Sequence, residues 1–121
     1  RFVLSGFLPN PPFMNKLVPD TMLKGKELFI DINSQTAKAL NLAQGDKVTL
    51  RTTQAEASVL VNITPTARPG VIYMPRGFGH KAYDEYIQNK GVNANSLVEV
   101  HLDPLSGNGI VWATRAQLRR A

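Results

Sequence analysis

The chain has 121 residues, of which 43% are hydrophobic and 19% are charged, and its formal net charge is +5 at pH 7. A chain of this length forms one domain around one hydrophobic core. Nine glycines and eight prolines are too few for a collagen-like chain, and apolar residues throughout exclude a strongly disordered one. The absence of cysteine excludes disulfides, thiol catalysis, iron–sulfur ligation and cysteine-based zinc sites within this sequence.

The ends of the sequence suggest a piece of a longer or processed protein. The chain begins with Arg1 rather than Met, and its first apolar stretch stops too soon for a signal peptide. No apolar run approaches the roughly 20 residues that span a bilayer, so we expect no direct membrane insertion. A binding site shared with other domains would therefore be only partly visible here.

The basic charge has two interpretations. The isoelectric point is near 9.8, but lysine and arginine are scattered singly, with one cluster at Arg115, Arg119 and Arg120. Aromatic residues do not alternate with them, as they would on a surface that stacks single-stranded nucleic acid. We therefore expect no nucleic-acid partner, and the charge indicates either a solvated basic surface or a site for a small anionic ligand.

The first third of the chain predicts an arm, a strand and a helix. Residues 1–26 are rich in proline and predict an extended arm or loop that precedes a domain at 27–121. Residues 28–32 predict a short strand, and Asn33 and Ser34 are candidate helix N-caps. The helix over 36–40 is expected to bury Ala37, Leu40 and Leu42.

Two alternating segments follow and predict a hairpin. Residues 47–52 and 57–64 alternate polar and apolar side chains, which is typical of half-buried strands. Residues 54–56 are a short connection between them. Before the first strand, Gly45 and Asp46 predict a turn in which the aspartate accepts a local hydrogen bond.

The second half predicts short elements separated by turns. They are a buried strand at 71–74 ended by Pro75, a glycine-rich loop at 77–80, a short helix at 83–88, an alternating strand at 97–102, a turn at 103–107 and a last strand at 110–118. Several short strands with two or three short helices predict a mainly β fold, as a closed or nearly closed barrel.

The order of these motifs resembles the C-terminal molybdopterin dinucleotide-binding domain of the molybdopterin oxidoreductases, the dimethyl sulfoxide reductase superfamily. The matching positions of the early motif are Ile32, Asn33, Ala37, Leu40, Leu42, Gly45, Asp46 and Val48. The series continues with Pro69-Gly70, Met74-Pro75, Asn95-x-Leu97 and Asp103-Pro104-x-Ser106-Gly107, so that it covers the chain from about residue 15 to the end. The resemblance implies a six-stranded double-psi β-barrel.

One stretch narrows the resemblance to a branch of that superfamily. Residues 77–83, Tyr86 and residues 90–93 are similar to polysulfide/thiosulfate reductase-like chains and, more closely, to the large subunits of quinone-linked respiratory complexes. Some chains of the latter group have lost the metal cofactor. The resemblance therefore implies either a cofactor-binding domain or a structural barrel in a cofactor-free homologue within a quinone-reducing membrane complex.

The implied cofactor is a bis-molybdopterin guanine dinucleotide with molybdenum or tungsten, held by the full-length enzyme. To bind such a group, a protein needs glycines where its backbone approaches the cofactor closely and cationic side chains that pair with the pyrophosphates. It also needs amide side chains that form hydrogen bonds with the edges of the rings. The candidate binding residues are Arg76, Gly77, Gly79, His80, Asn93 and Asn95. By resemblance, Asn95 is the asparagine of the family's N-x-L motif, in the pterin and phosphate environment.

Each candidate also has a structural interpretation. The two glycines could serve only a tight loop, the histidine could be an ordinary surface residue, and the two asparagines could be turn residues with left-handed backbone. Asn33 is assigned to helix capping and His101 to an exposed strand position. No catalytic residues are expected in this chain: the two histidines lack metal-binding spacing, and Asp84 and Glu85 are adjacent and point apart on a helix.

The resemblance implies a domain that clamps the cofactor against the catalytic domains of a respiratory oxidoreductase. The implied partners are other domains of the same large subunit and iron–sulfur and membrane-anchor subunits, and the implied location is the periplasm, with a cytoplasmic protein as the alternative. A third hypothesis, a double-psi barrel that binds DNA, requires a clustered basic face that the sequence lacks.

Overall fold

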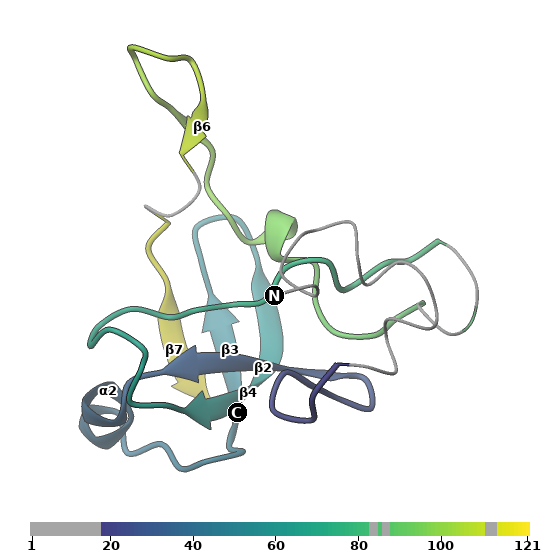
Figure 1. Cartoon of the computed structure of the whole chain (residues 1–121), viewed down its shortest axis with the longest axis vertical. Helices are drawn as coiled ribbons and strands as arrows, with labels where there is room; N and C mark the ends of the chain where they lie inside the picture. The colour runs from purple at the N-terminus through teal and green to yellow at the C-terminus, as the bar shows by residue number, and fades with distance from the viewer. Residues whose placement is uncertain (1–17, 83–84, 86–87, 111–113) are drawn as a thin grey trace.

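The computed structural model describes residues 18–82, 85, 88–110 and 114–121, and these residues form a mainly β structure (Figure 1). The elements in chain order are β1 (Leu23–Lys24), β2 (Glu27–Ile32), α2 (Ser34–Ala39), β3 (Lys47–Arg51), β4 (Glu56–Ile63), the 3₁₀ helix η2 (Ala94–Ser96), β5 (His101–Leu102), β6 (Gly109–Ile110) and β7 (Gln117–Arg120).

Five of the strands form one sheet in the order β1-β2-β4-β3-β7. The pair β2 and β4 is parallel, with Phe29 opposite Leu60 and Ile32 opposite Ile63, and the other pairs are antiparallel. The parallel pair is possible because α2 and β3 lie between its strands in the chain and carry the backbone back to the same end of the sheet.

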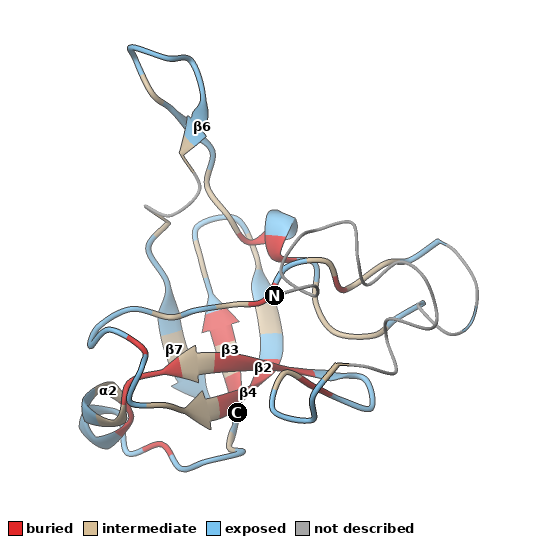
Figure 2. Cartoon of the chain, in the orientation of Figure 1, coloured by how far each residue is buried: buried red, intermediate tan, exposed pale blue. Residues whose placement is uncertain are grey.

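The core lies on the central strands, as Figure 2 shows. In β3 only alternate residues are buried, because a strand turns successive side chains to opposite faces, whereas β2 and β4 each bury three consecutive residues and are therefore covered on both faces there. The main cluster is Ile30, Ile32, Ala37, Leu42, Val48, Leu50, Val59, Val61 and Leu97. Each large side chain of this kind contributes about 1.5–3 kcal/mol relative to an exposed one. The predicted strands at 28–32, 47–52 and 57–64 are confirmed with small changes at their ends.

The short helix α2 is held at its start by Asn33. Its side-chain oxygen accepts a hydrogen bond from the Gln35 N–H at 2.8 Å, and its Nδ2 donates to the Ala67 carbonyl at 2.7 Å. The predicted N-cap is therefore confirmed. The prediction that Leu40 is buried is wrong: it lies after the last helical residue and is 45% exposed, whereas Leu42 is buried.

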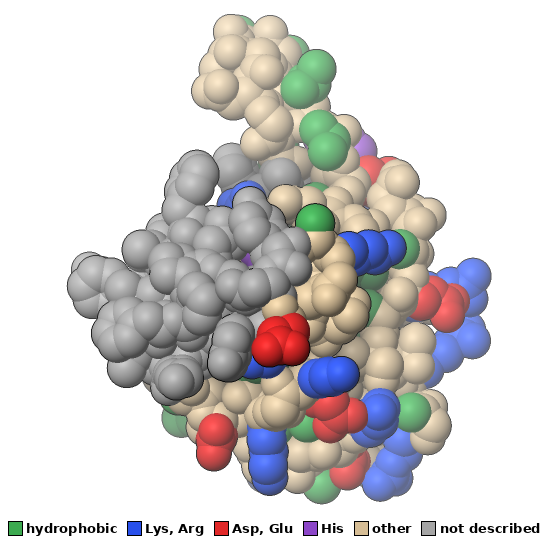
Figure 3. Space-filling view, turned by 90° about the vertical axis from the view of Figure 1, so that its right-hand side faces the viewer, with side chains coloured by type: hydrophobic (Ala, Val, Ile, Leu, Met, Phe, Trp, Pro, Cys, Tyr) green, Lys and Arg blue, Asp and Glu red, His purple; other side chains and the backbone are tan. Residues whose placement is uncertain are grey.

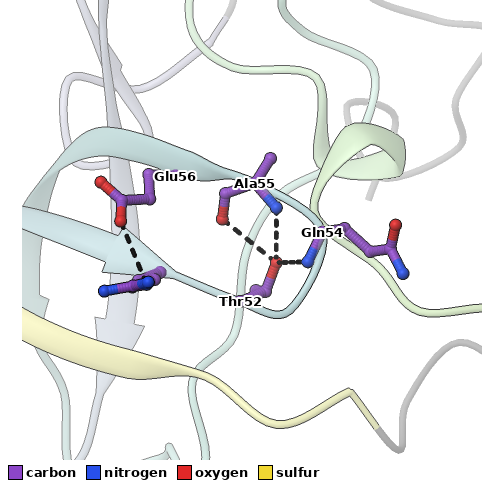
Figure 4. A network of polar contacts seen from close by, with 5 residues as sticks. Thr52, Gln54, Ala55 and Glu56 are labelled. Carbon is purple, nitrogen blue, oxygen red and sulfur yellow. Dashed lines mark hydrogen bonds and ion pairs between the residues drawn. The ribbon is translucent and has the colours of Figure 1, made fainter.

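The hairpin between β3 and β4 is closed by Thr52 (Figure 4). Its hydroxyl accepts hydrogen bonds from the Gln54 and Ala55 N–H groups and donates to the Ala55 carbonyl, each at 3.2 Å. An ion pair from Arg51 to Glu56, 3.1 Å long, joins the two strands beside this turn. The predicted turn near Asp46 is also confirmed, because its carboxylate accepts from the Ala43 N–H at 2.9 Å.

No closed barrel is found among the residues that the structure describes. The five-stranded sheet has open edges at β1 and β7, and β5 and β6 form a separate two-stranded sheet. The six-stranded double-psi barrel is therefore not confirmed, whereas the mainly β class is. One α-helix and one 3₁₀ helix lie in the described part of the chain, and the helix predicted at 83–88 falls largely outside it.

Three further predictions need correction. The predicted strand at 71–74 is reduced to one bridge between Tyr73 and Asp31. Of the predicted strands at 97–102 and 110–118, the structure retains β5, β6 and β7, and residues 111–113 lie outside its description. The arm predicted at 1–26 contains β1 where it is described, because a turn at Gly25 folds Leu23 back onto Leu28. The domain boundary at 26/27 stays a prediction.

Candidate functional site

Two segments that follow the central strands face each other beside the sheet. In residues 75–82 and 89–96, the Gly79 N–H donates to the Lys90 carbonyl at 2.7 Å, and the Asn89 N–H donates to the His80 carbonyl at 2.9 Å. The Gly91 N–H donates to the Lys26 carbonyl at 2.9 Å, which attaches the second segment to the β1–β2 turn. Backbone bonds therefore hold the two segments in a defined arrangement.

Phe78 anchors the first segment. Its ring is 4% exposed and packs against Leu23 and Leu28. The two glycines that flank this ring, at positions 77 and 79, are half-buried. Since both have positive φ, +91° at Gly77 and +77° at Gly79, glycine suits the sharp path of the chain around the ring.

Gly79 is also required by the close approach of the two segments. A Cβ atom at this position would lie 2.1 Å from the Asn93 backbone nitrogen and 2.5 Å from the Val92 carbonyl carbon. No side chain fits in that space. The direct contact of the two segments accounts for this glycine, which supports its structural interpretation as a loop-packing residue.

A pocket of about 870 Å³ lies between these two segments and the start of β4. All six predicted binding residues line it: Arg76, Gly77, Gly79, His80, Asn93 and Asn95. Sequence reasoning missed the other polar residues of this pocket, which are Glu56, Ser58, Lys81, Asn89 and Ser96. Lys81 could have been found from the sequence, because it directly follows the glycine-rich loop at 77–80. Ser58 could not, because it reaches the pocket only through the folding of β4 beside it.

The pocket is electrostatically positive. Arg76 and Lys81 are exposed on its lining, and neither has an ion-pair partner within the described ranges. The acidic residue on the lining, Glu56, is paired with Arg51 at 3.1 Å. Because the Glu56 charge is balanced by Arg51, the charges of Arg76 and Lys81 dominate the pocket.

The two asparagines have different roles. Asn93 caps η2, since its side-chain oxygen accepts a hydrogen bond from the Asn95 N–H at 3.0 Å. Its NH₂ group and one lone pair of this oxygen are left to face a ligand. Its φ is −76°, so the expected left-handed turn conformation is wrong for Asn93. The side-chain amide of Asn95 is exposed and makes no hydrogen bond with any residue that the structure describes. Its NH₂ group and its carbonyl oxygen are therefore both left for a ligand.

His80 contacts its own loop. Its Nε2 lies 3.2 Å from the Gly77 carbonyl oxygen, a distance at which a protonated Nε2 donates a hydrogen bond. The ring thus helps to close the glycine-rich loop. The other histidine, His101, is exposed and lies 3.4 Å from Glu99, in agreement with its assignment to an exposed strand position.

The described residues form no metal centre. No three metal-ligating side chains gather among the described residues. In the same residues, no helix has the length and apolar character needed to cross a membrane. Figure 3 shows lysine and arginine side chains mixed with acidic ones on the visible face.

The family model for the molydopterin dinucleotide binding domain matches residues 13–113. The chain therefore belongs to the family of molybdopterin dinucleotide-binding domains, which confirms the resemblance seen in its motifs. A relative, the menaquinone reductase, molybdopterin-binding-like subunit of Nitratidesulfovibrio vulgaris strain Hildenborough, is 37% identical over 102 residues. The match covers 84% of this chain and 15% of that protein.

A solved structure shows the same fold at low sequence identity. Acetylene hydratase from Pelobacter acetylenicus aligns with a TM-score of 0.63 over 77% of this chain, at 18% identity. The chain spans 14% of that structure. It therefore corresponds in size to one part of each of these two larger proteins.

Proposed function

We propose that this chain binds the pterin dinucleotide cofactor of a larger respiratory oxidoreductase and clamps it against the catalytic domains. The observation that carries the proposal is the pocket between residues 75–82 and 89–96, which collects all six predicted residues. The cofactor proposed is the bis-molybdopterin guanine dinucleotide with molybdenum or tungsten. When bound, such a cofactor supplies the metal centre for the redox chemistry of the full-length enzyme.

The donor set of the pocket fits a group with pyrophosphates and polar ring edges. Arg76 and Lys81, which form no ion pair with any described residue, provide positive charge for phosphate oxygens. Asn95 offers an amide that pairs both with donors and with acceptors on a ring edge. The close approach of Gly79 to Asn93 fixes the spacing of the two segments that carry these groups, so this chain both binds and orients the cofactor.

The test uses the full-length polypeptide with Arg76→Ala, His80→Ala and Asn95→Ala, singly and together. Loss of a charged hydrogen bond costs about 1.5–3 kcal/mol, so we expect Arg76→Ala to weaken cofactor retention by about ten- to a hundredfold. Arg68→Ala is the matched control, because Arg68 is also exposed but lies outside the pocket lining. Unchanged pterin and metal content in the triple variant would exclude this pocket as the cofactor site.

A second candidate is a structural domain in a cofactor-free homologue of a quinone-reducing membrane complex. It is favoured by the description of the 37% identical relative as molybdopterin-binding-like, and by the loop contacts that account for Gly79 and Asn93 without a ligand. Pterin and metal analysis of the native complex separates the two candidates. An intact complex without pterin supports the structural role.

The assembly and location of the full-length protein belong to the same proposal. We infer partners among other domains of the same large subunit and among iron–sulfur and membrane-anchor subunits, with the protein in the periplasm. The relative's description as a subunit of a menaquinone reductase supports the presence of further subunits. Purification of the native complex and cell fractionation test these points.

The complete domain is also proposed to close into the double-psi barrel. The family match and the TM-score of 0.63 support this, although the described strands form open sheets. A crystal or cryo-EM structure of the full-length protein tests it. A sheet still open between β1 and β7 would contradict the barrel.

A further inference from the structure

A two-stranded arm leaves the body of the protein after η2. Residues 98–110, which we call the β5–β6 arm, extend away from the five-stranded sheet (Figure 1). The side view shows the same projection with hydrophobic side chains on it (Figure 3). Three large apolar residues of the arm are strongly exposed: Val100 by 67%, Leu102 by 67% and Leu105 by 96%.

Two of the exposed apolar residues, Val100 and Leu102, form one face of the arm, and Leu105 lies in the turn at its tip. Glu99 and His101 lie on the opposite face, because their side chains approach each other to 3.4 Å. Since successive strand residues point to opposite sides, Val100 and Leu102 share the other face. Among the described residues, the partner strand adds no side chain to this face, because Gly109 stands opposite Leu102, and a Cβ there would lie 4.0 Å from Val100 Cγ1.

The apolar face carries no charged side chain. Asp103 at the tip is turned inward, since its carboxylate accepts hydrogen bonds from the Ser106 hydroxyl at 2.6 Å and the Leu105 N–H at 3.3 Å. Strands that remain in water are usually protected by lysine or proline against association with other chains. No lysine or arginine occurs between residues 98 and 110, although the chain as a whole carries a charge of +5, and the proline of the arm, Pro104, lies in its tip turn and not in a strand.

The arm is fixed at its base and uncovered beyond it. Leu97 is 3% exposed in the core, and the Thr114 hydroxyl accepts a hydrogen bond from the Glu99 N–H at 2.9 Å. Beyond this base, β5 and β6 have two residues each. A two-stranded hairpin of this kind is only marginally stable in water, so a covered apolar face would stabilise it.

We propose that the β5–β6 arm docks, through Val100, Leu102 and Leu105, into an apolar and uncharged groove on another domain of the same polypeptide. The choice of partner follows from the 37% identical relative, in which the matching segment makes up 15% of the length. In that relative, most of the polypeptide therefore lies outside the matching segment and can supply the partner domain. The inference rests on that part of the proposed function, and not on the cofactor.

Docking of the arm would also stabilise the candidate site. The arm continues directly from η2, whose Ala94 and Asn95 line the pocket, and Leu97 lies between them in the core. An arm held by a second domain restricts the movement of this segment. The arm is thus a positioning element for Asn95.

Hydrogen exchange of the full-length polypeptide, followed by mass spectrometry, tests the proposal. We expect amides of residues 98–110 to exchange at least tenfold more slowly than in a synthetic peptide of the same sequence. Exchange within threefold of the peptide rate would overturn the docking. Protection that increases with protein concentration would also overturn it, because the partner would then be a second copy.

Variants identify the face that docks. The double change Val100→Ser and Leu102→Ser is expected to accelerate exchange of the arm at least tenfold. Leu40→Ser is the control, since Leu40 is also an exposed leucine, at 45%, outside the arm. Equal exchange in the double variant and the wild type would refute the assignment of this face. The wild-type measurement does not require that any variant folds.

The same experiment separates the arm from the cofactor proposal. It is performed on preparations with and without bound pterin. Protection of the arm in a protein that never contains pterin supports the docking and contradicts the proposed cofactor role. Pterin bound to a protein with an unprotected arm supports the proposed cofactor role and contradicts the docking.

Discussion

Replacement of Gly79 by alanine tests whether the two loop segments are packed as closely as the structure shows. The new methyl group would lie 2.1 Å from the Asn93 nitrogen and 2.5 Å from the Val92 carbonyl carbon. The φ of +77° costs an alanine about 1–2 kcal/mol. Separation of the two backbones adds about 1–3 kcal/mol, the usual cost of an overpacked site. We therefore expect a loss of about 2–5 kcal/mol in the free energy of unfolding.

Gly45 provides a matched control for this change. Its φ is +81°, but a Cβ there would have no atom within 4 Å. Gly45→Ala therefore carries the conformational cost alone, about 1–2 kcal/mol. Urea unfolding of both variants, compared with the wild type, isolates the packing cost by difference. Equal destabilisation by the two changes would show that residues 77–80 and 92–93 are not in direct contact.

Three further changes address the turns, the cap and one carboxylate. Thr52→Ala removes three hydrogen bonds in the β3–β4 turn and is expected to cost about 1–2 kcal/mol in urea unfolding, whereas exposed Thr53→Ala should change stability by less than about 0.5 kcal/mol. Asn33→Ala removes the α2 cap and leaves a buried carbonyl unpaired, so we expect a loss of about 2–3 kcal/mol by the same measurement. The Ser106 hydroxyl, together with the backbone N–H groups of the tip, lowers the pKa of Asp103 from its ordinary 3.8. The stability that this carboxylate adds is therefore present above pH 3.8 and is lost as the pH falls through its lowered pKa, and Ser106→Ala should raise that pKa in an NMR titration.

The elements that could be predicted from the sequence are those defined by local patterns. Alternation marked β3 and β4, and an asparagine before a short apolar repeat marked the start of α2. Alternation gave a wrong prediction of burial at residues 97–102, because Val100 and Leu102 follow the spacing of core residues but remain exposed. The prediction that Leu40 is buried failed for a similar reason, because helical spacing was extended one residue beyond the end of the helix.

Contacts between distant segments could not be predicted in this way. The parallel pairing of β2 with β4 depends on how the chain returns, and β1 was hidden by the prolines around it. A turn signal at Gly25 between Leu23 and Leu28 was nevertheless present.

The candidate site was partly predictable because its residues lie in two short stretches. Motifs marked positions 76–80 and 93–95, and the backbone bond between Gly79 and Lys90 explains why these stretches line one pocket. The sequence suggested only a general turn role for Asn93. Its role as a helix cap could not be predicted, because it depends on the 3₁₀ geometry of η2. The wall provided by Ser58 depends on tertiary packing and had no local signal.

The position of β7 in the sheet has a consequence for synthesis on the ribosome. β3 pairs on one side with its neighbour in the chain, β4, and on the other side with β7, where Arg120 reaches Asp46 across 74 positions. Until residues 117–120 leave the exit tunnel, the outer backbone groups of β3 therefore lack their native partner strand. A nascent chain with such an open strand is susceptible to pairing with other chains. The pairing of β3 with β7 is therefore the step that completes this sheet, after the strands β1 to β4 have been synthesised.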